Sequence, residues 1–148
     1  SSHPIYTKIR TPDEATENFD VITYEKGASV VRMLETYLSP SVFQEGVRTY
    51  ISRHREGNTV ASDLWQALSE ASGFPVGPIV QKWITTKGFP LLRMSRKVRS
   101  EGTTLQFSQE PFSQKERKDK TLQGEVWPIP WIGRFGKKKQ IKKLSLVN

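Results

Sequence analysis

Few side chains in this sequence belong to the types that carry out catalysis. It contains two histidines, His3 and His54, and no cysteine, so a Ser-His-Asp arrangement would have to use one of these two imidazoles. Neither lies in a nucleophile-elbow pattern, and the sequence has no His-Glu-x-x-His motif and no Gly-rich phosphate loop. His54 ends the apolar stripe of a predicted helix, which favours a structural role. We therefore expect this chain alone to hold no catalytic zinc.

Tyr24 is the residue whose placement most suggests chemistry. It lies near the start of a predicted helix, in residues 19–34 with the sequence FDVITYEKGASVVRML. An unperturbed phenol stays protonated at neutral pH and can donate a hydrogen bond without carrying charge. Gly27, one turn later, weakens the helix by roughly 1 kcal/mol relative to alanine, so its presence needs a reason. Taken alone, the pattern favours close packing of Gly27 against a neighbouring helix and a core position for Tyr24.

Four helices are predicted to position these residues. Apolar side chains recur at spacings of three, four and seven through residues 19–38, and they form one stripe that we expect to be buried. The stripe comprises Tyr24, Val31, Leu34 and Leu38, with Val30 and Met33 beside them. Ser39 then begins a second helix, Ser62 is the expected N-cap of a third that ends at Gly73, and a fourth spans about residues 78–87.

Beyond Pro90 the apolar residues alternate with a period of two, which is typical of half-buried strands. The alternating positions are Leu92 and Met94, then Leu105 and Phe107, then Trp127, Ile129 and Trp131, then Leu144 and Leu146. Pro128 and Pro130 each remove a ladder donor, so their strand should lie at an edge or carry a bulge. The sequence thus predicts an α+β chain, with a helical bundle segment in residues 1–89 and a small antiparallel β-sheet or sandwich segment in residues 90–148.

Charge is divided unevenly between these two halves. Residues 1–89 hold nine Lys and Arg against ten Asp and Glu, net −1, whereas residues 90–148 hold fourteen against five, net +9. The second half would suit a nucleic acid or an anionic membrane, around Lys137, Lys138, Lys139, Lys142 and Lys143, with Trp127 and Trp131 nearby. Solvated lysines on an edge strand explain the same run more simply, so nucleic acid is the less favoured partner. No apolar run is long enough to span a bilayer, and the lack of cysteine fits a reducing compartment, which favours the cytoplasm.

Four stretches occur in the order that one enzyme family shows. Residues 19–34 are similar to the pattern Phe-Asp-x-Ile-Ser-Tyr-x-Lys-Gly-Ala-Ser, and the opening SSHPI, NTVASDLWQAL and KWITTKGFPLL match as well. The run VWPIPW falls where that family has a Trp-x-x-Pro-Ile strand. Together they resemble the gluzincin zinc aminopeptidases, of the aminopeptidase N and puromycin-sensitive type. The resemblance is strong through Leu92 and weak afterwards, and it places the chain in the C-terminal part of the catalytic domain and the start of the following β-sandwich domain.

The resemblance implies a role for each matching residue. Tyr24 corresponds to the family tyrosine that donates a hydrogen bond to the oxygen of the tetrahedral intermediate when a peptide is cleaved at its amino terminus. Phe19 corresponds to a position lining the substrate cleft near the scissile bond, although a packing role ahead of the helix explains it equally well. His3 lies in a family motif but is not a family zinc ligand, so we assign it a structural role.

The family's remaining catalytic parts all precede the point where this chain begins. They are the zinc motif, the general-base glutamate, the third ligand and the loop that binds the substrate's amino terminus. We therefore expect a fragment of a zinc aminopeptidase that is inactive alone, with zinc, the peptide substrate, the upstream catalytic segment and the downstream domains all belonging to a parent enzyme. Two alternatives stay open, namely a non-catalytic aminopeptidase-like interaction module and a basic nucleic-acid-binding β segment.

Overall fold

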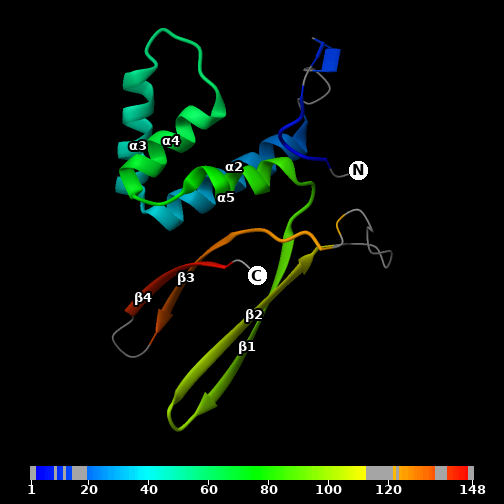
Figure 1. Cartoon of the computed structure of the whole chain (residues 1–148), viewed down its shortest axis with the longest axis vertical. Helices are drawn as coiled ribbons and strands as arrows, with labels where there is room; N and C mark the ends of the chain where they lie inside the picture. The colour runs from blue at the N-terminus through cyan, green and yellow to red at the C-terminus, as the bar shows by residue number, and fades with distance from the viewer. Residues whose placement is uncertain are drawn as a thin grey trace.

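The computed structural model describes residues 3–8, 10–11, 13–14, 20–112, 122, 124–135 and 140–146. The helices are α2 (Val21–Leu38), α3 (Pro40–Arg53), α4 (Ala61–Ser72) and α5 (Val76–Thr85). The strands are β1 (Pro90–Arg99), β2 (Gly102–Pro111), β3 (Ile129–Phe135) and β4 (Gln140–Leu146). The helices gather at one end of the molecule and the strands at the other (Figure 1). The predicted α+β class is confirmed, with helices first and antiparallel strands after them.

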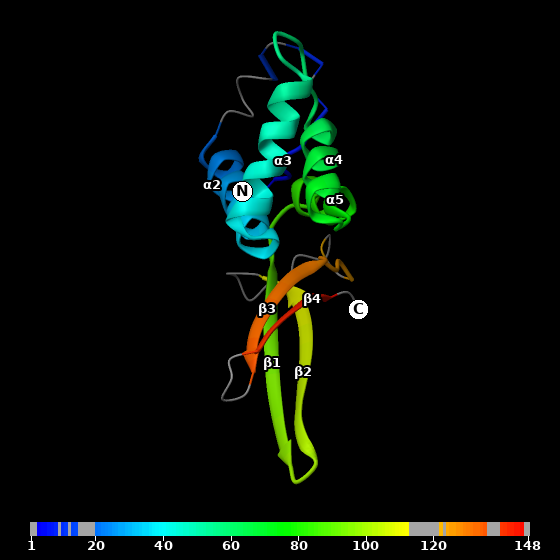
Figure 2. The ribbon, with the colours of Figure 1, turned by 90° about the vertical axis from the view of Figure 1, so that its left-hand side faces the viewer.

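The helical end has its core along one face of α2. The pair α3 and α4 stands as a helical hairpin, and α5 runs beside α2 below it (Figures 1 and 2). The buried core consists of Val30, Leu34, Tyr37 and Leu38 of α2 with Leu68, Val76 and Val80 of the later helices. These α2 positions are spaced by four, three and one, so they share one side of a helix with 3.6 residues per turn. Burial of this stripe, rather than intrinsic propensity, stabilises the helices.

The helix boundaries follow local chemistry, and two predicted starts shift. Val60, not Ser62, is the N-cap of α4, because the Val60 N–H donates to the Asp63 carboxylate at 2.9 Å and so places Asp63 at the third helical position. Helix α5 begins at Val76, two residues before the predicted Pro78. Gly73 ends α4 in the left-handed region with φ 68°, as predicted.

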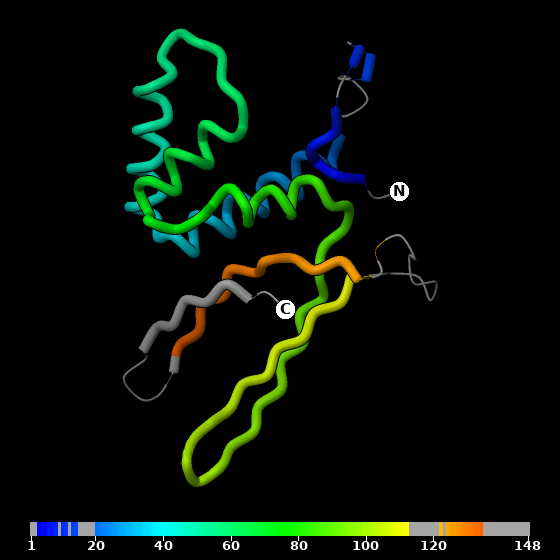
Figure 3. The backbone as a smooth tube through the Cα atoms, in the orientation of Figure 1, coloured from blue at the N-terminus to red at the C-terminus, as the bar shows by residue number. Residues whose placement is uncertain are grey.

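The β end consists of two antiparallel hairpins rather than one sheet. Strands β1 and β2 pair from Pro90 opposite Pro111 to Arg99 opposite Gly102, and β3 pairs with β4 from Ile129 opposite Leu146. The β1–β2 hairpin projects far from the helices (Figure 3). Within the described residues β3 pairs on one side only, as predicted for a strand that contains Pro130, whereas Pro128 precedes the strand.

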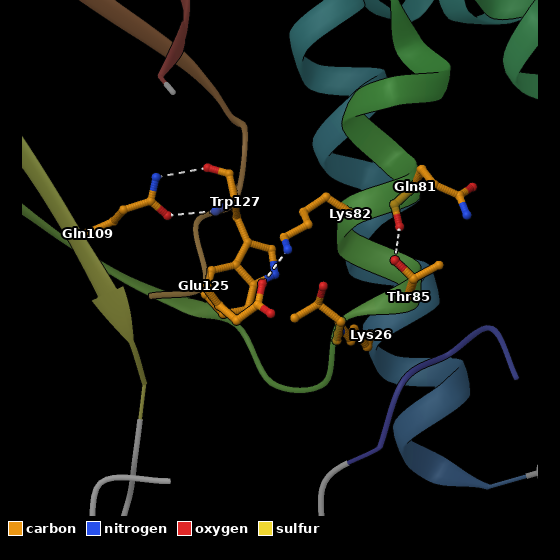
Figure 4. Close-up of polar contacts among 8 residues, drawn as sticks. Lys26, Gln81, Lys82, Thr85, Gln109, Glu125 and Trp127 are labelled. Carbon is orange, nitrogen blue, oxygen red and sulfur yellow. Dashed lines mark hydrogen bonds and ion pairs between the residues drawn. The ribbon is translucent and has the colours of Figure 1, made fainter. Parts of the chain in front are cut away.

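A short segment before β3 joins the hairpins to α5 (Figure 4). The Trp83 indole N–H donates to the Pro128 carbonyl at 2.8 Å. The Lys82 ammonium donates to the Glu125 carboxylate, which Figure 4 shows. Trp127, which the periodicity placed in a half-buried strand, instead precedes β3 and is completely buried. The Gln109 side chain bonds both the N–H and the carbonyl of Trp127, each at 2.9 Å. The assignment of residues 1–89 and residues 90–148 to two different domains stays a prediction.

Candidate functional site

Tyr24 lies on the first turn of α2, and its side chain faces outward. Its exposed fraction is 56%, and Val31 on the same helix is 41% exposed. The prediction that these two residues belong to the buried stripe was wrong. The face of α2 that packs into the core is the one that carries Val30 and Leu34. Neighbouring residues on a helix point about 100° apart, so Val31 points away from the direction of Val30. More than half of the surface of Tyr24 is therefore accessible, and the residue can contact a ligand.

Asp20 fixes the turn of backbone that carries Tyr24. It is the N-cap of α2, with extended backbone angles, and its Oδ1 accepts the Thr23 N–H at 2.9 Å. Its carbonyl oxygen accepts the Tyr24 N–H at 3.3 Å. A carboxylate at this end of a helix also interacts favourably with the helix dipole. The first turn of α2 is thus held by both the side chain and the backbone of one residue.

His3 connects the beginning of the chain to this cap. Its Nε2 lies 2.5 Å from Oδ2 of Asp20, and its Nδ1 lies 2.8 Å from the Pro4 carbonyl oxygen. The hydrogen bond to Asp20, then that to Pro4, raises the pKa of His3 above its ordinary value. The hydrogen bond from His3, together with that from the Thr23 N–H, lowers the pKa of Asp20 to about 2. The sequence predicted a structural role for His3 but not this partner, because the two residues are 17 positions apart.

Lys26, two residues after Tyr24, links α2 to the end of α5. Its ammonium donates to the Thr86 carbonyl oxygen at 2.5 Å, at the C-cap of α5. Burial lowers the pKa of Lys26 to about 8, because a desolvated ammonium is disfavoured. Sequence reasoning missed this contact, although Lys26 stands in the quoted motif, since periodicity carries no signal for a hydrogen bond spanning 60 residues. The turn bearing Tyr24 is therefore tied to the loop that leads into the strands.

Gly27 has an open surface beside it. A Cβ built on Gly27 would meet no atom within 4 Å outside its own helix backbone and its two chain neighbours, among the residues that the structure describes. The expectation that Gly27 allows close packing of a second helix was therefore wrong for these residues. Tyr24 and Gly27, one turn apart, together mark an uncovered strip of α2.

The other predicted site residues either lie outside the described residues or lie away from this strip. Phe19 lies outside the described residues, as do Lys137, Lys138 and Lys139 of the basic run. His54 is the C-cap of α3, and the centre of its ring lies 5.5 Å from that of Tyr50. Complete burial of Trp127 leaves it unable to stack on a base, which argues against a nucleic-acid surface there.

The described residues contain neither a cluster of metal ligands nor a membrane-spanning helix. No three His, Cys, Asp or Glu side chains in that part of the chain gather as a metal ion would require, so these residues do not fit a zinc site. None of the helices described above combines the length and the apolar character needed to cross a bilayer.

A groove opens further along α2, against β3. It has a volume of about 370 Å³ and is lined by Ser29, Arg32, Met33, Thr36 and Tyr37 with Pro130 and Ile132. Tyr24 is not among its lining residues. The candidate site is therefore the exposed first turn of α2, not this groove.

Comparison with known proteins relates most of the chain to peptidases. The peptidase family M1 domain matches residues 1–83. Tricorn protease-interacting factor F2 of Thermoplasma volcanium is 40% identical over 130 residues, which cover 88% of this chain and 16% of that protein. The puromycin-sensitive aminopeptidase of Caenorhabditis elegans is 41% identical over 130 residues, covering 88% of this chain and 14% of that protein.

A mammalian relative shows the same partial coverage. Human glutamyl aminopeptidase is 43% identical over 95 residues, which cover 64% of this chain and 10% of that protein. The chain thus spans 16% or less of the length of these three relatives.

Proposed function

Because the chain belongs to peptidase family M1, we propose that it is a segment of a zinc-dependent aminopeptidase and that Tyr24 stabilises the transition state of peptide hydrolysis. The relatives described above include enzymes named as aminopeptidases. The assignment of a metallopeptidase class follows from the family. The substrate is a peptide cleaved at its amino terminus, and the zinc site belongs to parts of the enzyme other than the described residues.

The observation that carries the proposal is the exposed phenol of Tyr24 on a firmly held helix turn. A residue that is 56% exposed can contact a ligand, while Asp20 and Lys26 fix the backbone on either side of it. A neutral hydroxyl donor aimed at a carbonyl oxygen interacts more strongly as that oxygen gains negative charge. Such preorganisation lowers the barrier, since the donor need not reorient during the reaction.

Gly27 supports the same assignment. The strip of α2 beside Tyr24 is bare among the described residues, so an extended peptide or a neighbouring part of the enzyme has room to lie there. A larger side chain at this position would project into that space. Phe19 is proposed to line the cleft near the scissile bond, on the family resemblance alone.

The test is Tyr24→Phe in the full-length protein that contains this chain. Removing one transition-state donor should lower kcat by about 10²–10³-fold, with little change in KM and no change in bound zinc. Tyr50→Phe is the matched control, because the Tyr50 hydroxyl bonds the Thr59 hydroxyl at 2.7 Å on a separate part of the helical end. Hydrolysis of aminoacyl nitroanilides gives kcat and KM, and elemental analysis gives zinc. An unchanged kcat in Tyr24→Phe would refute the role proposed for Tyr24, whereas a full-length wild type without measurable hydrolysis would favour the non-catalytic interaction module.

A further inference from the structure

His3 lies between two groups that can only accept hydrogen bonds. The Pro4 carbonyl oxygen is 2.8 Å from Nδ1, and the Asp20 carboxylate is 2.5 Å from Nε2. A neutral imidazole carries one N–H, so it can satisfy one of these acceptors but not both. Only the doubly protonated imidazolium donates to both at once. The geometry of the ring therefore selects the charged form of His3.

Asp20 relays this contact to Tyr24. Its Oδ2 faces His3, its Oδ1 accepts the Thr23 N–H at 2.9 Å, and its backbone carbonyl accepts the Tyr24 N–H at 3.3 Å. The side chains of His3 and Asp20 are 29% and 36% exposed, so the pair is partly shielded from water. The ring of His3 is thus two hydrogen bonds away from the backbone of Tyr24.

We infer that His3 is a positioning residue for Tyr24, which acts through Asp20 to hold the first turn of α2 in the orientation needed for catalysis. This inference rests on the proposed function of Tyr24. A donor must be held to within a few tenths of an ångström to stabilise a transition state, so a loose helix start would lower turnover.

The contact depends on pH in a defined direction. Asp20 is the titratable group in contact with the ring among the described residues. The hydrogen bonds to Asp20 and Pro4 raise the pKa of His3, so the pair is fully formed below the ordinary histidine value of 6.5. As the pH rises through the raised value, the ring loses its positive charge and one of its two hydrogen bonds, so its attraction to the Asp20 carboxylate weakens.

The experiment measures kcat against pH in the full-length protein for wild type, His3→Ala and Asp20→Asn. Asparagine still accepts the Thr23 N–H, so Asp20→Asn keeps the helix cap and replaces the charged oxygen that faces His3 with an amide NH2 group. Both variants should lower kcat by about tenfold at pH 6, less than the ~10²-fold that a displacement of about 1 Å costs, with KM little changed. The wild-type decrease above the His3 pKa should be absent from both profiles. His54→Ala is the control and should keep the wild-type profile.

The same two changes are then repeated in the Tyr24→Phe background. If His3 acts through the Tyr24 hydroxyl, they should cost less than about twofold there, because residues acting as one unit are non-additive. A wild-type profile in His3→Ala and Asp20→Asn overturns the inference, and so does an equal loss of kcat in both backgrounds. Unchanged kcat in Tyr24→Phe alone overturns instead the proposed function. Thermal unfolding of Asp20→Asn establishes that the variant is folded.

Discussion

Two glycines within helices should respond in opposite directions to the same substitution, Gly→Ala. In the interior of α2, a Cβ on Gly27 meets nothing within 4 Å in the described part of the chain. Alanine should therefore raise the free energy of unfolding by about 1 kcal/mol, because glycine loses more backbone entropy on folding. On Gly46 of α3, a Cβ would lie 2.8 Å from Cδ2 of Leu68 and 3.0 Å from its Cα.

The contact at Gly46 involves backbone of α4, which cannot move aside cheaply. Overpacking of this kind costs about 1–3 kcal/mol, which offsets or exceeds the gain of about 1 kcal/mol in helix propensity. Gly46→Ala should therefore leave stability unchanged or lower it by up to about 2 kcal/mol. The two variants should differ by about 1–3 kcal/mol although the chemical change is identical.

Thermal unfolding followed by circular dichroism at 222 nm tests the pair on the 148-residue chain. For a chain of this size, 1 kcal/mol corresponds to a shift in Tm of about 2–4 °C, upward for Gly27→Ala and unchanged or downward for Gly46→Ala. Urea titration at 25 °C supplies the free energies and shows whether the m-value stays constant. If Gly27→Ala lowers Tm as much as Gly46→Ala does, the α2 surface is covered and the description of an open strip is refuted.

Three other substitutions test the anchors of the site. The wild type should gain stability between pH about 8 and 10.5, because the pKa of Lys26 is about 8 in the folded chain and the unfolded chain therefore binds more protons in this range. Lys26→Met should abolish this gain. Urea midpoints at pH 8 and 10 measure it, and an equal gain in both proteins would contradict the assignment. Trp83→Phe removes the donor to the Pro128 carbonyl and should cost about 1–2 kcal/mol in the urea titration, whereas a neutral result would mean that this joint contributes nothing. Leu68→Ala should cost about 2–5 kcal/mol by the same method, because its side chain is completely buried in the helical core, and a loss below 1 kcal/mol would argue against that core.

The order and type of the elements could be predicted from sequence because they follow from local periodicity. Spacings of three and four produced the helices, and the alternation after Pro90 produced the strands. Helix starts were less secure, since Val60 became the N-cap of α4 through the Asp63 side chain three residues later. A hydroxyl at Ser62 looked like the stronger cap, but the hydrogen bond that the Val60 N–H donates to the Asp63 carboxylate places the helix start earlier.

The candidate site could be predicted only in part. The motif identified Tyr24, but the stripe that included it was assigned to the core, since periodicity alone does not say which of two adjacent apolar faces packs inward. The contacts that position Tyr24 join residues far apart in sequence, namely His3 with Asp20 and Lys26 with Thr86. Such pairs depend on tertiary packing, which no local pattern encodes.

The junction between the long β1–β2 hairpin and the segment before β3 has a consequence for mutational robustness. The Gln109 amide bonds both backbone groups of Trp127, as one residue of an antiparallel hydrogen-bonded pair would. A true ladder tolerates almost any side chain, because the backbone makes it. This junction instead requires a planar group with a donor and an acceptor, which only glutamine and the shorter asparagine provide. A single substitution of Gln109 can therefore break the contact between the hairpin and Trp127 while the hairpin itself stays intact.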